Sequence, residues 1–109
     1  PVCPEGYEHG YQSYPCLFQP EAATPESIPR INEARNKWMD DLLQAGVSTR
    51  PATHAVHMLT YYREKYGLKP VDFPNAWAAN DCSISLPLFH GMTAAEQEHV
   101  IEQVLVRNP

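Results

Sequence analysis

Eleven prolines are spread through a chain of only 109 residues, and they constrain its fold more than any other feature. Proline fixes its own φ angle and disfavours helical geometry in the residue before it, so each one limits how far a helix or strand extends. The same chain carries several runs with helical or alternating hydrophobic periodicity. We therefore expect many short elements joined by sharp corners.

Length and charge narrow the possible folds and partners. A chain of this length is typical of one domain with a modest core, so we expect residues 1–109 to form a single domain with residues 1–8 as a connector. Eight basic and 13 acidic residues give a net charge of −5. This balance argues against nucleic acid or an anionic membrane as partner, and no apolar run approaches the roughly 20 residues of a membrane helix.

The three cysteines indicate a reducing environment. Cys3, Cys16 and Cys82 are odd in number and far apart, so they match neither a disulfide framework nor a paired zinc spacing. A cytoplasmic location is the simplest expectation.

Three stretches have the character of strands. Residues 9–19 are aromatic and alternate in polarity, with Pro15 at an edge or at a position that makes no ladder hydrogen bond. Residues 47–50 form a short extended piece, and residues 83–88 alternate apolar with small or polar side chains. These stretches predict a small, mostly antiparallel, three-stranded sheet.

Helical periodicity covers much of the remaining chain. Residues 28–43 predict an amphipathic helix, and residues 75–82 a short one. Thr93 and Glu96 have the spacing of a capping box at the start of a last helix. The buried face of the first helix is predicted to hold Ile31, Ala34, Trp38 and Leu42. Helices packed on one face of the sheet make an α+β sandwich.

Another helix is predicted within residues 46–66. Gly46 suits the left-handed position that ends the preceding helix, and Thr53 is a plausible N-cap for the next one. The predicted buried face of this second helix consists of Val56, Leu59, Tyr62 and Tyr66.

The same stretch gathers hydrogen-bonding side chains. His54 and His57, three residues apart, are expected on a common side of the helix near its N-terminus. The whole polar set is Arg50, His54, His57, Tyr61 and Tyr62. It is either a polar rim on a packed helix or part of a functional site. The two histidines are half a metal site, as a small metal-dependent hydrolase would need, but no third ligand stands at a suitable distance, so we expect no metal.

Other catalytic signals were not found in the sequence. It contains no glycine-rich phosphate loop and no local signature of a nucleophilic cysteine. Lys37, Lys65 and Lys69 lie in helix or turn settings that predict exposure, unlike a lysine that forms an imine. We therefore expect this chain by itself to lack catalytic residues.

Four short motifs resemble one enzyme family. The motifs are GVSTRP at 46–51, YYR at 61–63, SLPLF at 85–89, and GMT at 91–93 followed by an acidic helix. In this order they resemble the C-terminal portion of the DegT/DnrJ/EryC1/StrS aminotransferases. The resemblance implies a pyridoxal-phosphate enzyme that aminates a keto group of a nucleotide-linked sugar, with a donor such as glutamate, for example in polysaccharide biosynthesis.

The resemblance also implies an incomplete enzyme. The chain starts at Pro1 and corresponds to the small C-terminal domain of a fold-type I aminotransferase, so a large N-terminal domain would carry the cofactor-binding residues and the reactive lysine. The full-length protein is expected to be a homodimer with its active site at the subunit interface, and this piece alone to be inactive.

The resemblance assigns four substrate-side residues. His57 is the first, because the family often places a histidine there facing the sugar nucleotide, followed by Arg50 and His54 and then Tyr62. A different interpretation of the chain is a stand-alone, non-catalytic binding or assembly module descended from that domain.

Overall fold

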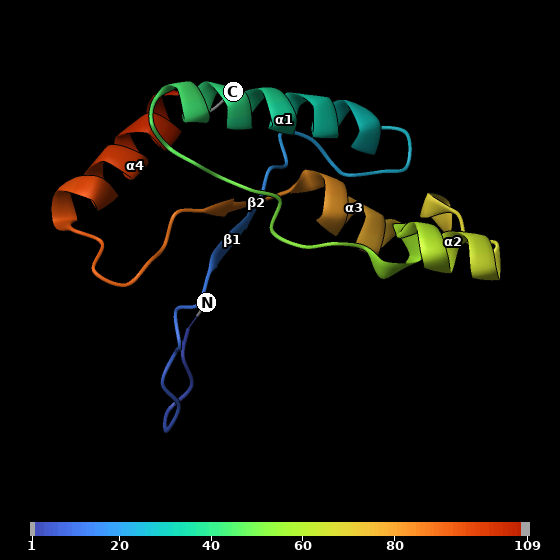
Figure 1. Cartoon of the computed structure of the whole chain (residues 1–109), viewed down its shortest axis with the longest axis horizontal. Coiled ribbons are helices and arrows are strands. Elements are labelled where there is room, and N and C mark those ends of the chain that lie inside the picture. Colours follow the sequence, from blue (N-terminus) through green and yellow to red (C-terminus); the bar gives the residue numbers. More distant parts are fainter. Residues whose placement is uncertain (1, 108–109) are drawn as a thin grey trace.

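The chain has an α+β fold, described by a computed structural model over residues 2–107. Within these residues, four α-helices accompany a two-stranded antiparallel sheet and two short 3₁₀ turns (Figure 1). In chain order the elements are β1 (Tyr14–Leu17), α1 (Ile28–Gln44), η1 (Val56–Met58), α2 (Thr60–Tyr66), η2 (Pro70–Asp72), α3 (Pro74–Cys82), β2 (Ser83–Leu86) and α4 (Ala94–Val106).

The sheet pairs two strands that are far apart in sequence. Cys16 of β1 lies opposite Ile84 of β2, and Pro15 lies opposite Ser85. Ser85 directs both its backbone groups away from Pro15: its N–H donates to the Arg50 carbonyl at 2.7 Å, and its carbonyl accepts from the Arg50 N–H at 3.4 Å. Pro15 therefore occupies a position where no ladder donor is needed.

The predicted third strand at residues 47–50 is wrong. It is reduced to an isolated bridge between Arg50 and Ser85. The next possible ladder donor, the Ala52 N–H, binds the Ser83 hydroxyl at 3.3 Å and not a backbone carbonyl, so pairing stops after one residue.

Helix α1 supplies most of the core. Its buried residues follow a spacing of three and four: Ile28, Ile31, Arg35, Trp38 and Leu42. They pack with Phe18, Val47, Cys82 and Ile84. Ala34, predicted to be buried, is exposed, because the apolar stripe continues through position 35 instead.

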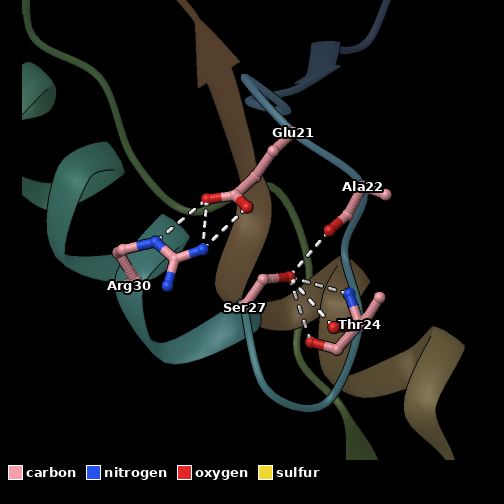
Figure 2. A network of polar contacts seen from close by, with 5 residues as sticks. All are labelled: Glu21, Ala22, Thr24, Ser27 and Arg30. Carbon is pink, nitrogen blue, oxygen red and sulfur yellow. Dashed lines mark hydrogen bonds and ion pairs between the residues drawn. The ribbon is translucent and has the colours of Figure 1, made fainter.

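Both ends of α1 are fixed by local hydrogen bonds. Before the helix, the Ser27 hydroxyl accepts from the Thr24 N–H at 2.8 Å and donates to the Ala22 carbonyl at 2.7 Å, while Arg30 pairs with Glu21 at 2.7 Å (Figure 2). These contacts fold the preceding loop over the first turn of the helix.

The end of α1 confirms the prediction for Gly46, which has φ +83°. The Gly46 N–H donates to the Leu43 carbonyl at 3.0 Å and the Val47 N–H to the Leu42 carbonyl at 2.9 Å. This pair of bonds is the Schellman motif, and it turns the Val47 side chain into the core.

The predicted helix with Thr53 as its N-cap is wrong. Helix α2 begins only at Thr60, and none of its side chains is buried. Bonds to distant residues hold the preceding segment out of helical geometry: the Ala55 N–H donates to Asn80 Oδ1 at 2.8 Å, and the Ala52 N–H to the Ser83 hydroxyl at 3.3 Å. The side chains predicted as a buried face are exposed, namely Val56, Leu59, Tyr62 and Tyr66.

The molecule is more extended than a compact domain of its length. Its radius of gyration is 16.1 Å, against about 13 Å for a compact 109-residue domain. Helix α3 packs against α1, α2 extends beyond it on one side of the sheet, and α4 lies on the other side (Figure 1). Much apolar surface therefore stays uncovered. Within residues 2–107 no helix combines the length and the hydrophobicity needed to cross a membrane.

Helix α4 starts with the predicted capping box. The Thr93 hydroxyl accepts from the Glu96 N–H at 3.2 Å, and the Glu96 carboxylate accepts from the Thr93 N–H at 2.8 Å. Helix α4 is also joined to the C-terminal end of α1, because His99 Nε2 of α4 lies 3.0 Å from the Ala45 carbonyl.

The capping box makes a prediction about acid stability. Hydrogen bonds from Thr93 hold the pKa of Glu96 below its ordinary value of 4.5. Because this pKa is lowered by folding, the contribution is full above about pH 4.5 and disappears as the pH falls through the folded-state value. We expect Glu96→Gln to flatten this part of the acid melting profile, measured as Tm between pH 6 and pH 3. Glu102→Gln on the exposed face of α4 should leave the profile unchanged, and an identical effect of both substitutions would contradict the assignment.

Candidate functional site

Three of the four predicted site residues line one cleft. The cleft has a volume of about 550 Å³ and lies between α2, α3 and the loop before η1. His54, His57 and Tyr62 belong to it, whereas Arg50 does not. Its full lining is Thr53, His54, Ala55, Val56, His57, Tyr62, Tyr66, Leu68, Phe73, Ala76 and Ala79. We call it the His57 cleft.

The His57 side chain is buried in the lining of this cleft and does not form an exposed polar rim. Its side chain is only 7% exposed, and its ring packs on Phe73 with 5.0 Å between the ring centroids. Its Nε2 lies 3.2 Å from the Pro70 carbonyl. A carbonyl can only accept, so the neutral ring carries its proton on Nε2 and keeps Nδ1 as an acceptor. His54, by contrast, is exposed, and the expected common helical side for the two histidines is wrong.

The other wall of the cleft is aromatic. Tyr62 stacks on Tyr66 with nearly parallel rings, 6.4 Å between centroids, and meets the edge of Tyr61 at 5.1 Å. Lys65 Nζ lies 5.1 Å from the centroid of the Tyr61 ring and 5.4 Å from that of Tyr66, and it donates to the Tyr61 hydroxyl at 2.8 Å. Exposed aromatic faces beside a cation suit a ligand that has a ring and some polar groups.

Arg50 lies in a second, more polar pocket of about 250 Å³. Its lining comes from the loop before β1, the loop after α1, and β2 with its following segment. The residues are Gln12, Ser13, Ser48, Thr49, Arg50, Ser85, Leu86, Pro87, Leu88 and Phe89. We call it the Arg50 pocket.

Sequence reasoning missed Phe73 and Arg35. Phe73 follows a turn, and no local pattern indicated that it would pack on a histidine 16 residues earlier. Arg35 is 4% exposed and donates from Nη1 to the Ser83 carbonyl at 2.9 Å, which fixes the start of β2. Burial lowers the pKa of Arg35, and the nearby Asp81 charge opposes this shift. The only sequence signal for the burial of Arg35 is its position in the three-and-four spacing of the buried residues of α1.

In the described part of the chain, potential metal ligands do not gather in groups of three and the lysines are not buried. Residues 2–107 contain no group of three or more His, Cys, Asp or Glu side chains close enough to hold a metal ion. Lys37, Lys65 and Lys69 are all exposed.

Comparison with known proteins identifies the family. The sequence pattern of the DegT/DnrJ/EryC1/StrS aminotransferase family matches residues 19–105. "Uncharacterized protein MJ1066" of Methanocaldococcus jannaschii is 28% identical over 104 residues, which is 95% of this chain and 25% of that protein. "Spore coat polysaccharide biosynthesis protein SpsC" of Bacillus subtilis is 41% identical over 49 residues, 45% of this chain and 13% of that protein. The chain thus spans a quarter or less of these relatives. It belongs to the DegT/DnrJ/EryC1/StrS aminotransferase family.

Proposed function

We propose that this chain is the C-terminal small domain of a longer pyridoxal-phosphate-dependent aminotransferase that aminates a keto group of a nucleotide-linked sugar. The observation that carries the proposal is the family match over residues 19–105 in a chain that corresponds to a quarter of a longer relative. The name of the Bacillus subtilis relative refers to polysaccharide biosynthesis, which favours a sugar substrate.

The role of this domain is to shape the substrate pocket. Because its lysines are exposed, the cofactor and the amino-transfer chemistry would belong to the rest of the enzyme. The His57 cleft offers aromatic walls for a ring and His57 Nδ1 as an acceptor for a hydroxyl group. Fixing such a substrate in one orientation is a contribution to catalysis that needs no reactive group here.

The uncovered apolar surfaces support assembly with more polypeptide. A groove of about 630 Å³ between α4 and the segment after β2 is lined mainly by apolar side chains, and Ile101 and Leu105 on α4 are 49% and 71% exposed. Continuous apolar surface of this kind is typical of an interface. We expect the remainder of the enzyme, including the second subunit of a homodimer, to cover these faces.

Substitution of His57 tests the proposed function in the full-length enzyme. We expect His57→Ala to raise the KM for the nucleotide sugar about tenfold, the equivalent of one lost hydrogen bond and its packing, while leaving the affinity for pyridoxal phosphate nearly unchanged. Separate titrations of cofactor and substrate measure the two effects.

Two further variants make this experiment specific. His57→Gln keeps a donor for the Pro70 carbonyl and therefore separates loss of the local fold from loss of the ligand contact. His9→Ala changes an exposed histidine that lines neither this cleft nor the groove at α4, and should leave both affinities unchanged. Cofactor loss with an unchanged sugar response, or no aminotransferase activity in the unmodified enzyme, would contradict the proposal.

A further inference from the structure

The Arg50 pocket is lined by several hydrogen-bond donors and one cation, and it is separate from the His57 cleft. Its polar side chains come from Gln12, Ser13, Ser48, Thr49, Arg50 and Ser85. Although the chain has 13 acidic residues, none of the described residues that line this pocket is Asp or Glu. Hydroxyl groups around one uncompensated guanidinium form a donor set suited to an oxyanion.

The backbone of Arg50 is fixed in place, and the charge of its exposed side chain is not paired. Its backbone is held from both sides by Ser85. Among residues 2–107, its guanidinium has no hydrogen-bond or ion-pair partner. Three other arginines do have partners: Arg30 binds Glu21, Arg35 binds the Ser83 carbonyl, and Arg107 binds Gln103. A positioned but unpaired arginine in an acidic chain is available for a ligand.

The residues before Arg50 add unsatisfied polar groups. The Thr49 hydroxyl oxygen is buried and has no hydrogen-bond partner within the described chain. The backbone N–H groups of Ser48 and Thr49 also find no acceptor there. Buried polar groups are normally satisfied, so the unpaired Thr49 hydroxyl beside a cation indicates where a ligand oxygen binds.

We propose that the Arg50 pocket binds an oxyanion, either a phosphate of the nucleotide sugar or a carboxylate of the amino donor. Arg50 supplies the positive charge, and Ser48 and Thr49 supply hydrogen bonds. The His57 cleft, with its aromatic walls, then takes an uncharged ring. The identity of the ligand rests on the proposed function, whereas the binding of an oxyanion by this pocket does not.

Titration of the 109-residue chain with simple anions tests the site. In ¹H–¹⁵N correlation spectra, we expect sodium pyrophosphate or glutamate to shift the amide signals of Ser48, Thr49 and Arg50. Arg50→Gln should weaken the binding at least about fivefold, because it removes a charge-assisted hydrogen bond, and Arg50→Lys should weaken it less. Arg63→Gln, at an exposed arginine outside the pocket, is the matched control and should bind like the unmodified chain.

The two probes distinguish the two sources of the anion. A response to pyrophosphate alone assigns the pocket to a phosphate, and a response to glutamate alone assigns it to a carboxylate; a response to both supports a general oxyanion site. No response to either probe, or equal binding by the Arg50→Gln and Arg63→Gln variants, would overturn the proposal. The spectra also report directly whether each variant is folded.

Kinetics of the full-length enzyme separate this inference from the proposed function. Arg50→Gln should raise the KM for only one of the two substrates, the nucleotide sugar or the amino donor. If the full-length protein transfers no amino group, the proposed function fails while the titration still decides the oxyanion site. If it is active but the titration shows nothing, only the oxyanion site fails.

Discussion

Leu42→Ala is expected to lower the free energy of unfolding by about 2–5 kcal/mol. Leu42 is fully buried within the core cluster under α1, so truncation removes apolar contacts and leaves a cavity that the neighbouring side chains fill only in part. Urea denaturation followed by circular dichroism measures the loss.

The adjacent residue is the control for this prediction. Leu43 is 59% exposed, so Leu43→Ala should change the free energy of unfolding by no more than about 0.5 kcal/mol. Equal losses for the two variants would show that α1 packs through a different face.

Arg35→Ala is expected to have the second large effect, a loss of about 2–4 kcal/mol. The substitution removes the buried stem of the side chain and leaves the Ser83 carbonyl without its charge-assisted hydrogen bond. Arg35→Met, which keeps the apolar stem, should recover part of the loss. Thermal or chemical unfolding measures both variants.

Arg30 offers the matched comparison on the same helix. Its ion pair with Glu21 joins side chains that are 67% and 44% exposed, so Arg30→Ala should cost at most about 1 kcal/mol. If Arg30→Ala were as destabilising as Arg35→Ala, burial would not be the reason for the Arg35 effect.

Two predictions that rest on neighbouring residues were confirmed. The capping box of Thr93 and Glu96 forms as expected, and Gly46 adopts the left-handed conformation that ends α1. In each case the partners lie within a few residues, so the local sequence contains both sides of the interaction.

Predictions that rest on periodicity alone failed where distant residues compete for the backbone. Asn80 binds the Ala55 N–H and Ser83 binds the Ala52 N–H, so the segment before η1 stays extended and α2 starts only at Thr60. In the predicted helix the Thr53 hydroxyl would accept from the Ala55 N–H, the donor that Asn80 binds instead.

The candidate site also combines what the sequence predicted with what the tertiary structure decided. Family motifs predicted His54, His57 and Tyr62, which the fold places in one cleft, and Arg50, which the fold places in another pocket. The roles of these four residues toward a substrate stay predictions.

The sequence by itself determined the family, the Thr93–Glu96 capping box, the end of α1 at Gly46, and the existence of α1, α3, β2 and α4, because short-range spacing encodes them. Only the tertiary structure decided the burial of Arg35, the contact of His57 with Phe73, and the gathering of unpaired donors around Arg50. These features depend on residues that are separated along the chain and meet only when α1 and the sheet pack together, so no local pattern records them.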